Sequence, residues 1–354
     1  MAFYYSLDRK NPVDRRIAQR LLLLKEGIRN PDPQINSPIP EKTIESTLLI
    51  ATWNIREFDS PKYGPRSKEC LFYIAEIISS FDLVAVQEVN EDLTALNRVM
   101  TILGTWWKYL ITDVTRGTRG NRERIAYLYD TRKVSFGGLA GEILIPPLEK
   151  MRKTIGPSVQ FYRTPYIAGF RAAWFKFEIC SVHIVYGNSK ADDPDRIDEI
   201  EKIAKFLANE SKEPTAWANN WILLGDFNIF KITDSTFKAI TDSGFIIPDN
   251  SRGNSNVARD KCFDQIAFIL EDRAYNKLKD SRSGVFDYYQ YVYTEDDEKI
   301  FAPDMGDKYK SKPADGKGRY YRDWRTYQMS DHLPKWIEIK IDFGEEYLTD
   351  KSKP

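Results

Sequence analysis

The chain has 354 residues, of which 42% are hydrophobic, so it can bury a substantial core as one large domain, alone or with an appendage. Lysine plus arginine and aspartate plus glutamate both number 52, which excludes a global positive field that would attract nucleic acid. No apolar run approaches the length of a membrane span, and the first residues lack the basic-then-apolar order of a secretory signal. We therefore expect a cytoplasmic protein that contacts no membrane. The three cysteines, Cys70, Cys180 and Cys262, have no metal-binding spacing, which favours reduced thiols.

The predicted elements begin with a helical extension and linker over residues 1–46, packed on the main domain. Asn11-Pro12 is typical of a helix start, and residues 13–28 can form about four turns before a proline-rich connector. The further expected helices are 69–81, 91–103 with Asn90 as its cap, and 195–209. The expected strands are 48–55, 83–89, 125–130, 172–186, 221–227, 263–269 and 335–341. Strands this numerous, mixed with amphipathic helices, indicate α/β or α+β packing.

Polar side chains of a consistent kind stand at the ends of five expected strands. They are Asn54, Glu88, His183, Asp226 with Asn228, and Asp331 with His332. A strand end can hold a side chain rigidly, which is where functional sites tend to be built. Carboxylate and amide oxygens suit a hard cation such as Mg²⁺, and the two histidines of the chain suit proton transfer and stabilisation of phosphoryl charge. The pattern predicts a phosphodiester-cleaving site, and a structural zinc site is not expected because no cysteine accompanies the histidines.

These motifs give the chain a resemblance to the endonuclease/exonuclease/phosphatase superfamily of DNase I-like enzymes. Seven pieces follow one another in that family's order between Leu48 and Ile341, namely TWN, QE, RERIAYLYD, SVH, GDFN, FDQI and SDHLP. The resemblance implies an α/β (α+β) fold, a DNase I-like two-layer β-sandwich of mixed sheets flanked by helices. It also implies a catalytic domain over residues 47–345, with a long insertion at about 271–328 and a C-terminal tail over 346–354.

The resemblance further implies how the metal and the water are held. Glu88 would be the chief ligand of a Mg²⁺ ion, for which Mn²⁺ or Ca²⁺ could substitute. Asn54 would lie beside it, and Asp331 could share the cation. Asp226 would orient or deprotonate the attacking water, while Asn228 would hold the scissile phosphate. A simple turn at Gly225–Asn228 and a strand-end cap at Asn54 are the alternatives without chemistry.

Side chains around the phosphate follow from the same resemblance. His332 would sit on the phosphate with Asp264 behind it, which fixes the tautomer of the ring. His183 would face the phosphate from the other side, supported by Glu123. Arg171 would approach the substrate backbone. A surface ion pair within the neighbouring arginines remains the alternative for Glu123, and a satisfied core position remains the alternative for either histidine.

Two basic stretches could supply the local positive charge. Arg122, with Arg116 and Arg119, lies in a Gly- and Arg-rich stretch before the strand at 125–130 and is expected to bind substrate. The second stretch, at 308–328, interleaves lysine and arginine with tyrosine and tryptophan, a composition that suits backbone contacts and base stacking. Its Arg319, Arg322 and Arg325 are expected to flank the cleft, and a solvated loop is the alternative.

We therefore expect a monomeric, Mg²⁺-dependent phosphodiester hydrolase, with DNA as the favoured substrate and endonucleolytic cleavage by an activated water. The FDQI and RERIAYLYD motifs lean towards the nuclease members of the family. A phosphatase or phospholipase acting on inositol phosphates or sphingomyelin is the alternative within the same superfamily. A catalytically inactive nucleic-acid-binding module is the alternative from another class.

Overall fold

Two mixed β-sheets form the centre of the structure, a computed structural model that describes residues 2–60, 62–116, 121–144 and 161–353. The described strands are β1 (Thr47–Phe58), β2 (Leu83–Asn90), β3 (Trp107–Ile111), β4 (Glu123–Asp130), β5 (Ser135–Glu142), β6 (Tyr166–Ala172), β7 (Phe175–His183), β8 (Asn220–Asp226), β9 (Asp264–Ile269), β10 (Ser283–Val285) and β11 (Lys335–Lys340). The sheet orders are β10-β11-β1-β2-β4-β3 and β5-β6-β7-β8-β9. Strands β1 and β2 are parallel, as are β7 and β8, and the other described neighbours are antiparallel.

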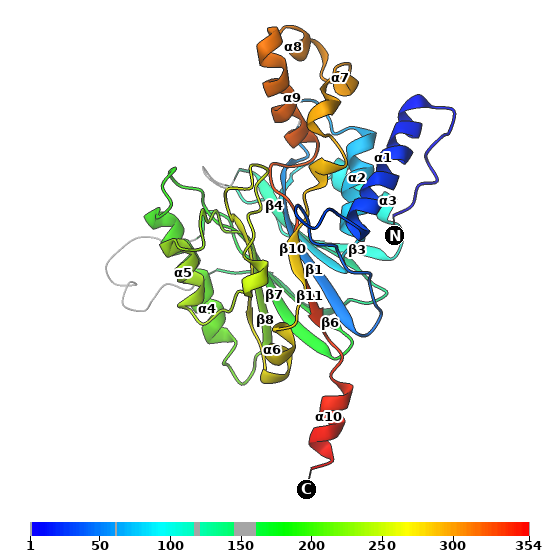
Figure 1. Ribbon diagram of the computed structural model, residues 1–354. Helices are drawn as coiled ribbons and strands as arrows, with labels where there is room; N and C mark the ends of the chain where they lie inside the picture. The colour runs from blue at the N-terminus through cyan, green and yellow to red at the C-terminus, as the bar shows by residue number, and fades with distance from the viewer. Residues whose placement is uncertain (1, 61, 117–120, 145–160, 354) are drawn as a thin grey trace.

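Helices cover the outer faces of both sheets (Figure 1). The first sheet is covered by α1 (Pro12–Arg29), α2 (Lys68–Ser79) and α3 (Thr94–Leu103), and the second by α4 (Pro194–Glu210) and α5 (Ser235–Thr241). The other described helices are α6 (Asp272–Leu278), α7 (Glu298–Phe301), α8 (Gly306–Lys310), α9 (Ala314–Gln328) and α10 (Gly344–Lys351), with short 3₁₀ turns η1 (Asp249–Ser251), η2 (Tyr288–Gln290) and η3 (Glu295–Asp297). The expectation of a two-layer β-sandwich flanked by helices is confirmed. No helix in the described part of the chain combines the length and apolarity needed to cross a bilayer.

The alternation of side chains along β1 shows how the layers are packed. Leu48 and Ile50 belong to the apolar cluster between the two sheets, whereas Ala51 and Trp53 belong to the cluster under the helices of the first sheet. Successive strand residues point to opposite faces, so a strand that is apolar on both faces is buried on both. This double burial holds the ends of the central strands in fixed positions.

Capping residues start α1 and α4 close to where the sequence indicates. The side-chain oxygen of Asn11 accepts from the backbone N–H of Val13 at 2.9 Å, and Pro12 occupies the first helical position of α1. Helix α4 begins one residue earlier than expected, at Pro194, and the carboxylate of Asp193 accepts from the N–H of Arg196 at 3.1 Å. Side-chain caps of this kind satisfy N–H groups that have no partner within the helix.

Two local expectations were wrong. The strand predicted over 172–186 is shorter, because β7 covers only Phe175–His183 and Ala172 ends β6. The chain reverses between these two strands at Ala173, whose φ is 48°. The expected cap of α3 at Asn90 fails because Asn90 is the last residue of β2 and pairs with Glu123. Helix α3 starts at Thr94, after Asp92 has accepted from the Thr94 N–H at 2.9 Å.

The segment 271–328 is well structured, which corrects the alternative of a solvated loop for residues 308–328. Strand β10 pairs with β11 at the edge of the first sheet, and α7, α8 and α9 project from one end of the sandwich next to α1 (Figure 1). A cluster of aromatic rings packs this projection, including Tyr293 stacked on Phe301 with centroids 4.4 Å apart. Helix α1 supports the projection through the ion pair of Arg20 with Asp297.

Candidate active site

The ends of several strands bring the predicted polar residues to one edge of the sandwich. Residues His183 and Asp226, at the carboxyl ends of the parallel strands β7 and β8, face each other in the sheet register. Asp264 begins the antiparallel neighbour β9 and pairs with Asp226, so it lies at the same edge. Glu123 begins β4 beside the carboxyl end of β2 in the other sheet. The topology thus collects residues that are far apart in sequence into one cluster.

Asp226 lies at the centre of this cluster. Its Oδ2 atom accepts from Nδ2 of Asn54 at 3.0 Å and lies 3.6 Å from Nε2 of His183 and 3.7 Å from Nε2 of His332. Its Oδ1 atom accepts from the backbone N–H of Asn228 at 2.8 Å. The side chain is almost fully buried. One carboxylate oxygen is therefore fixed by the backbone, and the other faces both imidazoles.

His332 forms a buried pair with Asp264. Its Nδ1 donates to Oδ2 of Asp264 at 2.8 Å, which directs Nε2 towards Asp226. Ser255 donates to the same Asp264 oxygen at 2.6 Å, and the His332 ring stacks on Phe263 at 5.4 Å between centroids. Burial alone would lower the pKa of His332, but the nearby carboxylates, with Asp264 foremost, raise that pKa well above its ordinary value. This shift favours the protonated form of the ring.

His183 forms a similar buried pair with Glu123, but its pKa shifts in the opposite direction. Its Nδ1 donates to Oε2 of Glu123 at 3.1 Å, and Arg163 donates to the other oxygen of that carboxylate. Burial and the positive charge of Arg163 lower the pKa of His183 to about 4, against the opposing effect of Asp226 and Glu88. His183 is therefore neutral at pH 7, with the lone pair of Nε2 directed into the cluster.

Asn54 and Glu88 form the oxygen-rich part of the cluster. Nδ2 of Asn54 donates to Oε1 of Glu88 at 3.0 Å, and Oε2 of Glu88 accepts from the backbone N–H of Glu57 at 2.7 Å. The Oδ1 atom of Asn54 is buried and has no hydrogen-bond partner among the described residues. A buried acceptor without a donor is rare in proteins and calls for an explanation. The donor set of one carboxylate and one amide oxygen is suited to a hard divalent cation.

Groups of acidic and histidine side chains are positioned to bind a metal ion. One group comprises Glu88, Glu123 and His183, and another comprises Asp226, Asp264 and His332. In both groups the Nδ1 atom of the histidine already donates to a carboxylate. Glu88 and Asn54 keep oxygen lone pairs directed into the site, so these two residues fit a metal ion best.

The turn that carries His332 is fastened to β1 by hydrogen bonds. The Ser330 hydroxyl donates to the Asn54 carbonyl at 2.6 Å and accepts from the N–H groups of Arg56 and His332 at 3.1 and 3.0 Å. The carbonyl of His332 accepts from the Trp53 indole N–H and from the Tyr288 hydroxyl, both at 3.0 Å. This anchoring holds the imidazole at a fixed place relative to Asn54 and limits its motion.

Left-handed backbone conformations occur within the cluster. Glu88 has a backbone φ of 61° and Asn228 has a φ of 53°, values that residues other than glycine adopt at a cost. Strained residues persist where the surrounding structure holds them, and they tend to occur at functional sites. Both residues contact the cluster, Glu88 by accepting from Asn54 and Asn228 by donating its backbone N–H to Asp226.

The structure does not bring every predicted residue into this cluster. The carboxylate of Asp331 is directed to Arg56, whose Nε lies 3.6 Å away, and its side chain is about half exposed. Arg171 pairs with Lys176 at the beginning of β7, the end of the strand opposite His183, so it lies away from the site. Arg122 precedes Glu123 but is exposed and paired with Glu91 at 2.6 Å.

The arginines of the two basic stretches also differ in where the structure places them. Arg325 is buried, donates to the carbonyl of Tyr293 at 2.8 Å and pairs with Glu295, so its charge is already engaged within the protein. Arg319 and Arg322 are exposed on α9. Arg116 is exposed at the end of a described segment, and Arg119 lies outside the described residues.

Sequence reasoning missed three residues that support the cluster, namely Arg163, Ser255 and Ser330. Ser330 could have been found, since it stands in the SDHLP motif itself. Arg163 and Ser255 lie in irregular segments and no motif marks them. Their role depends on tertiary contacts that the sequence pattern does not encode.

Comparison with solved structures identifies the fold. A protein described as an endonuclease/exonuclease/phosphatase from Bacteroides vulgatus is 13% identical, with a TM-score of 0.51 and coverage of 84% of this chain and 100% of that one. A mannosyl-6-phosphatase from Bacteroides thetaiotaomicron is 14% identical, with a TM-score of 0.51 and coverage of 82% and 99%. The chain has the endonuclease/exonuclease/phosphatase fold. At the level of the fold this confirms the resemblance drawn from the motifs.

The endonuclease/exonuclease/phosphatase fold is shared by enzymes with different substrates, so it does not fix the reaction. No family model matches the chain. A deoxyribonuclease of Thioalkalivibrio is 29% identical over 188 residues, which are 51% of this chain and 46% of that protein. The chain thus spans about half the length of the curated relative that it matches. The activity and the substrate therefore have to be argued from the site.

Proposed function

We propose that the protein is a metal-dependent phosphodiester hydrolase and that its substrate is DNA, cleaved endonucleolytically by an activated water. The observation that carries this proposal is the convergence of two carboxylate-backed histidines on one oxygen of Asp226. Such an arrangement supplies a base for water and hydrogen-bonding groups for phosphoryl oxygens within one small volume.

Asp226 is the group that activates the nucleophile. Its Oδ1 is held by the N–H of Asn228, while Oδ2 accepts from the amide of Asn54 and lies between the two imidazoles. A water bound at Oδ2 can transfer a proton to the carboxylate as its oxygen forms a bond to phosphorus. The bond between phosphorus and the leaving oxygen then breaks, that oxygen takes up a proton from solvent, and Asp226 returns its proton to solvent.

His332, Asn228 and His183 surround the phosphate. His332 is protonated, so its Nε2–H can donate to a non-bridging phosphoryl oxygen, where negative charge grows in the transition state. The amide of Asn228 uses one hydrogen on the Ile184 carbonyl at 2.8 Å, and its other hydrogen can donate to the phosphate. Neutral His183 can accept a proton at Nε2 from the opposite side.

Glu88 and Asn54 would hold the metal ion, for which Mg²⁺ is the best match to two oxygen ligands with several retained waters. When bound, the ion supplies Lewis-acid stabilisation of a phosphoryl oxygen. The side chain of Asp331 is engaged with Arg56, so its carboxylate is less available as a metal ligand than that of Glu88.

DNA is favoured over other phosphodiesters by two arguments. The sequence motifs FDQI and RERIAYLYD lean towards nuclease members of the superfamily, and the curated relative is named as a deoxyribonuclease. The decisive experiment incubates the purified protein with plasmid DNA, RNA and inositol phosphates, with Mg²⁺ or with EDTA. Mg²⁺-dependent cleavage of DNA supports the proposal, and release of inorganic phosphate from inositol phosphates alone would replace it by the phosphatase function.

A further inference from the structure

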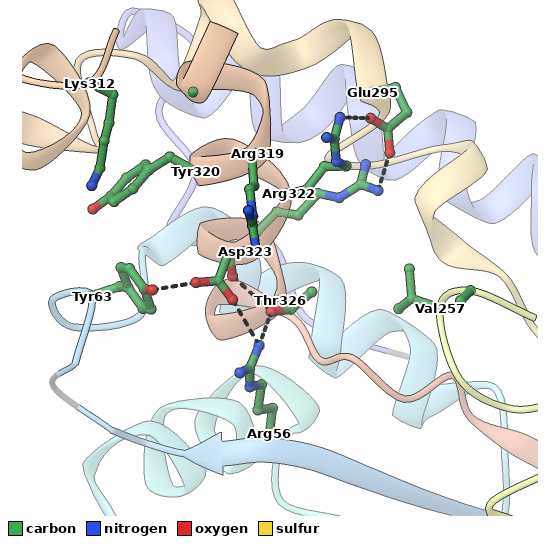
Figure 2. A pocket seen from close by; sticks show the side chains of 13 residues that line it. Arg56, Tyr63, Val257, Glu295, Lys312, Arg319, Tyr320, Arg322, Asp323 and Thr326 are labelled. Atoms are coloured by element: carbon green, nitrogen blue, oxygen red, sulfur yellow. Dashed lines mark hydrogen bonds and ion pairs between the residues drawn. The ribbon is translucent and has the colours of Figure 1, made fainter. Parts of the chain in front are cut away.

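A groove of about 1000 Å³ lies between α9 and the loop that follows β1 (Figure 2). Its lining comprises Arg56, Tyr63, Val257, Ala258, Glu295, Lys312, Gly316, Arg319, Tyr320, Arg322, Asp323, Arg325 and Thr326. Five of these side chains are cationic and two are carboxylates, so the groove is positive although the chain as a whole has no net charge. Such a local cluster can attract a polyanion.

The two carboxylates of the groove are already engaged. Asp323 accepts from the Tyr63 hydroxyl and lies 3.4 Å from the Arg56 guanidinium, as Figure 2 shows. Glu295 pairs with buried Arg325 and lies 3.7 Å from Arg322. Arg319 and Lys312, by contrast, have no carboxylate partner among the described residues, and both are exposed. Their charges remain available for an anionic ligand.

Aromatic rings accompany these cations. Tyr63 packs edge-on against Tyr320 with centroids 5.7 Å apart, and in a tilted arrangement against Tyr327 with centroids 4.4 Å apart. Tyr63 and Tyr320 are half-buried, so part of each ring faces the groove. A groove that combines cations with accessible rings is the common feature of proteins that bind single-stranded nucleic acids, because phosphates contact the cations and bases stack on the rings.

The groove begins next to the catalytic cluster. Arg56 is two residues beyond Asn54 on β1, a separation of about 7 Å along a strand. Its Nε lies 3.6 Å from the carboxylate of Asp331, the residue before His332. A polynucleotide that enters the cluster can therefore continue directly into the groove.

We propose that this groove binds unpaired nucleotides next to the scissile phosphate, with backbone phosphates on Arg319, Arg322 and Lys312 and a base against Tyr320. The preferred substrate is then single-stranded or frayed DNA. In a duplex the bases are stacked inside the helix and only phosphates would meet the groove, which would leave its rings unused. The inference rests on the proposed function for the position of the scissile phosphate, whereas binding of unpaired nucleotides can be measured independently.

The test measures the anisotropy of a fluorescein-labelled 12-nucleotide oligothymidylate in EDTA, so that no cleavage occurs. The double variant Arg319→Gln/Arg322→Gln should bind about tenfold more weakly than the wild type. The slope of log affinity against log salt should fall by about 1.4, because each phosphate contact on a single strand contributes about 0.7. The matched control is Lys308→Gln/Lys310→Gln, which removes the same charge from exposed positions of α8 outside the groove. Equal affinities of the two double variants would overturn the proposal.

A second variant tests the base. Tyr320→Ala should weaken binding of the oligothymidylate about tenfold, since stacking of one base on an aromatic ring is of that order. An abasic strand with the same phosphates should bind the wild type and Tyr320→Ala equally. Tighter binding of a blunt hairpin duplex than of the single strand would overturn the proposal. The proposal would also fail if inositol hexakisphosphate displaced the strand from the protein and the Arg319→Gln/Arg322→Gln variant weakened binding of inositol hexakisphosphate but not of the strand.

Failure of this inference is distinguishable from failure of the proposed function. If binding of the strand depends on Arg319 but no Mg²⁺-dependent cleavage occurs, the proposed groove stands and the proposed hydrolase function fails. If the protein cleaves DNA but substitutions of Arg319, Arg322 and Tyr320 leave binding unchanged, the hydrolase function stands and the proposed groove fails. Circular dichroism and thermal unfolding of each variant show whether the fold is retained.

Discussion

The Nε2 atoms of His183 and His332 lie 3.6 and 3.7 Å from the same oxygen, Oδ2 of Asp226. Although they share this neighbour, their pKa values shift in opposite directions. Burial and then the charge of Arg163 lower the pKa of His183, whereas the carboxylates beside His332, with Asp264 foremost, raise its pKa against the effect of burial. The site therefore combines a neutral imidazole and an imidazolium on opposite sides of one carboxylate. Groups with separated pKa values are what acid–base chemistry at one pH requires.

This difference predicts two separate titrations. In metal-free protein the pKa of His183 is lowered to about 4, so its ring should stay neutral from pH 8 to pH 5 and become charged near pH 4. The pKa of His332 is raised, so its ring should lose its proton at a higher pH than an ordinary histidine does. The chain has two histidines, so imidazole ¹⁵N NMR spectra can be assigned with His183→Gln alone. Joint titration of both rings near pH 6.5 would contradict the electrostatics.

The lowered pKa of His183 also makes the free energy of unfolding depend on pH. The pKa of His183 in the folded state lies below its value in the unfolded chain, so the folded state binds fewer protons between pH 6.5 and about 4. The contribution of His183 is present above pH 6.5 and is lost as the pH falls through that window.

Arg163→Gln should alter His183 through the intervening Glu123. Arg163 contributes to the lowered pKa of His183, so its removal should raise that pKa towards neutrality. We expect turnover to fall about tenfold with little change in KM, because Arg163 acts by positioning Glu123 and His183. The NMR titration gives the pKa directly, and Arg163→Lys should restore part of both effects. An unchanged His183 titration in folded Arg163→Gln would show that the guanidinium has no such role.

How well the sequence predicted each residue depended on the local signal. Asp264 and His332 were placed correctly because each adjoins a short apolar strand whose direction the pattern indicates. Arg171 is expected near the substrate only from the family resemblance, and the chain reversal at Ala173 instead places it beside Lys176, at the end of β7 opposite His183. The apolar pattern cannot reveal such a turn when polar turn residues are missing.

The burial of Arg325 is a consequence of the helix that the composition of its stretch does not reveal. The helical period places Arg325 beside Tyr321 and Trp324 on the buried face of α9. Arg163 could not be predicted, because it reaches Glu123 only through the packing of an irregular segment. Contacts of this kind are set by the tertiary structure.

Asp226→Asn should lower kcat by about 10²–10⁴-fold, the usual contribution of a positioned base. The variant should fold, because the new side-chain oxygen can still accept from the N–H of Asn228. The rate is measured with bis(p-nitrophenyl) phosphate, a small diester, and with DNA. Asp307→Asn, which alters an exposed carboxylate on α8, is the matched control and should behave as the wild type. Retention of most activity in folded Asp226→Asn would refute the assigned chemistry.

Glu88→Gln should weaken binding of the metal ion by at least about tenfold, because one of the two oxygen ligands loses its charge. Titration calorimetry with Mn²⁺ and Mg²⁺ measures the affinity, and high metal concentration should partly rescue activity. Asp331→Asn is the informative comparison. If Asp331 serves Arg56 and not the metal, this variant should bind Mn²⁺ as the wild type does. Equal loss of affinity in both variants would restore Asp331 as a shared ligand.

Gly225→Ala should destabilise the fold strongly. Gly225 has φ of 132°, and a Cβ atom built there would lie 2.0 Å from the backbone carbonyl oxygen of Val182 in β7. Strands β7 and β8 would have to separate just before His183 and Asp226, so we expect a loss of about 3 kcal/mol or more in the free energy of unfolding. Urea denaturation measures the loss. Gly141→Ala in β5 is the control, because its Cβ would meet no heavy atom within 4 Å and should change stability by less than about 0.5 kcal/mol. Similar stabilities of the two variants would mean that the close approach of β7 and β8 at the GDFN motif is not required.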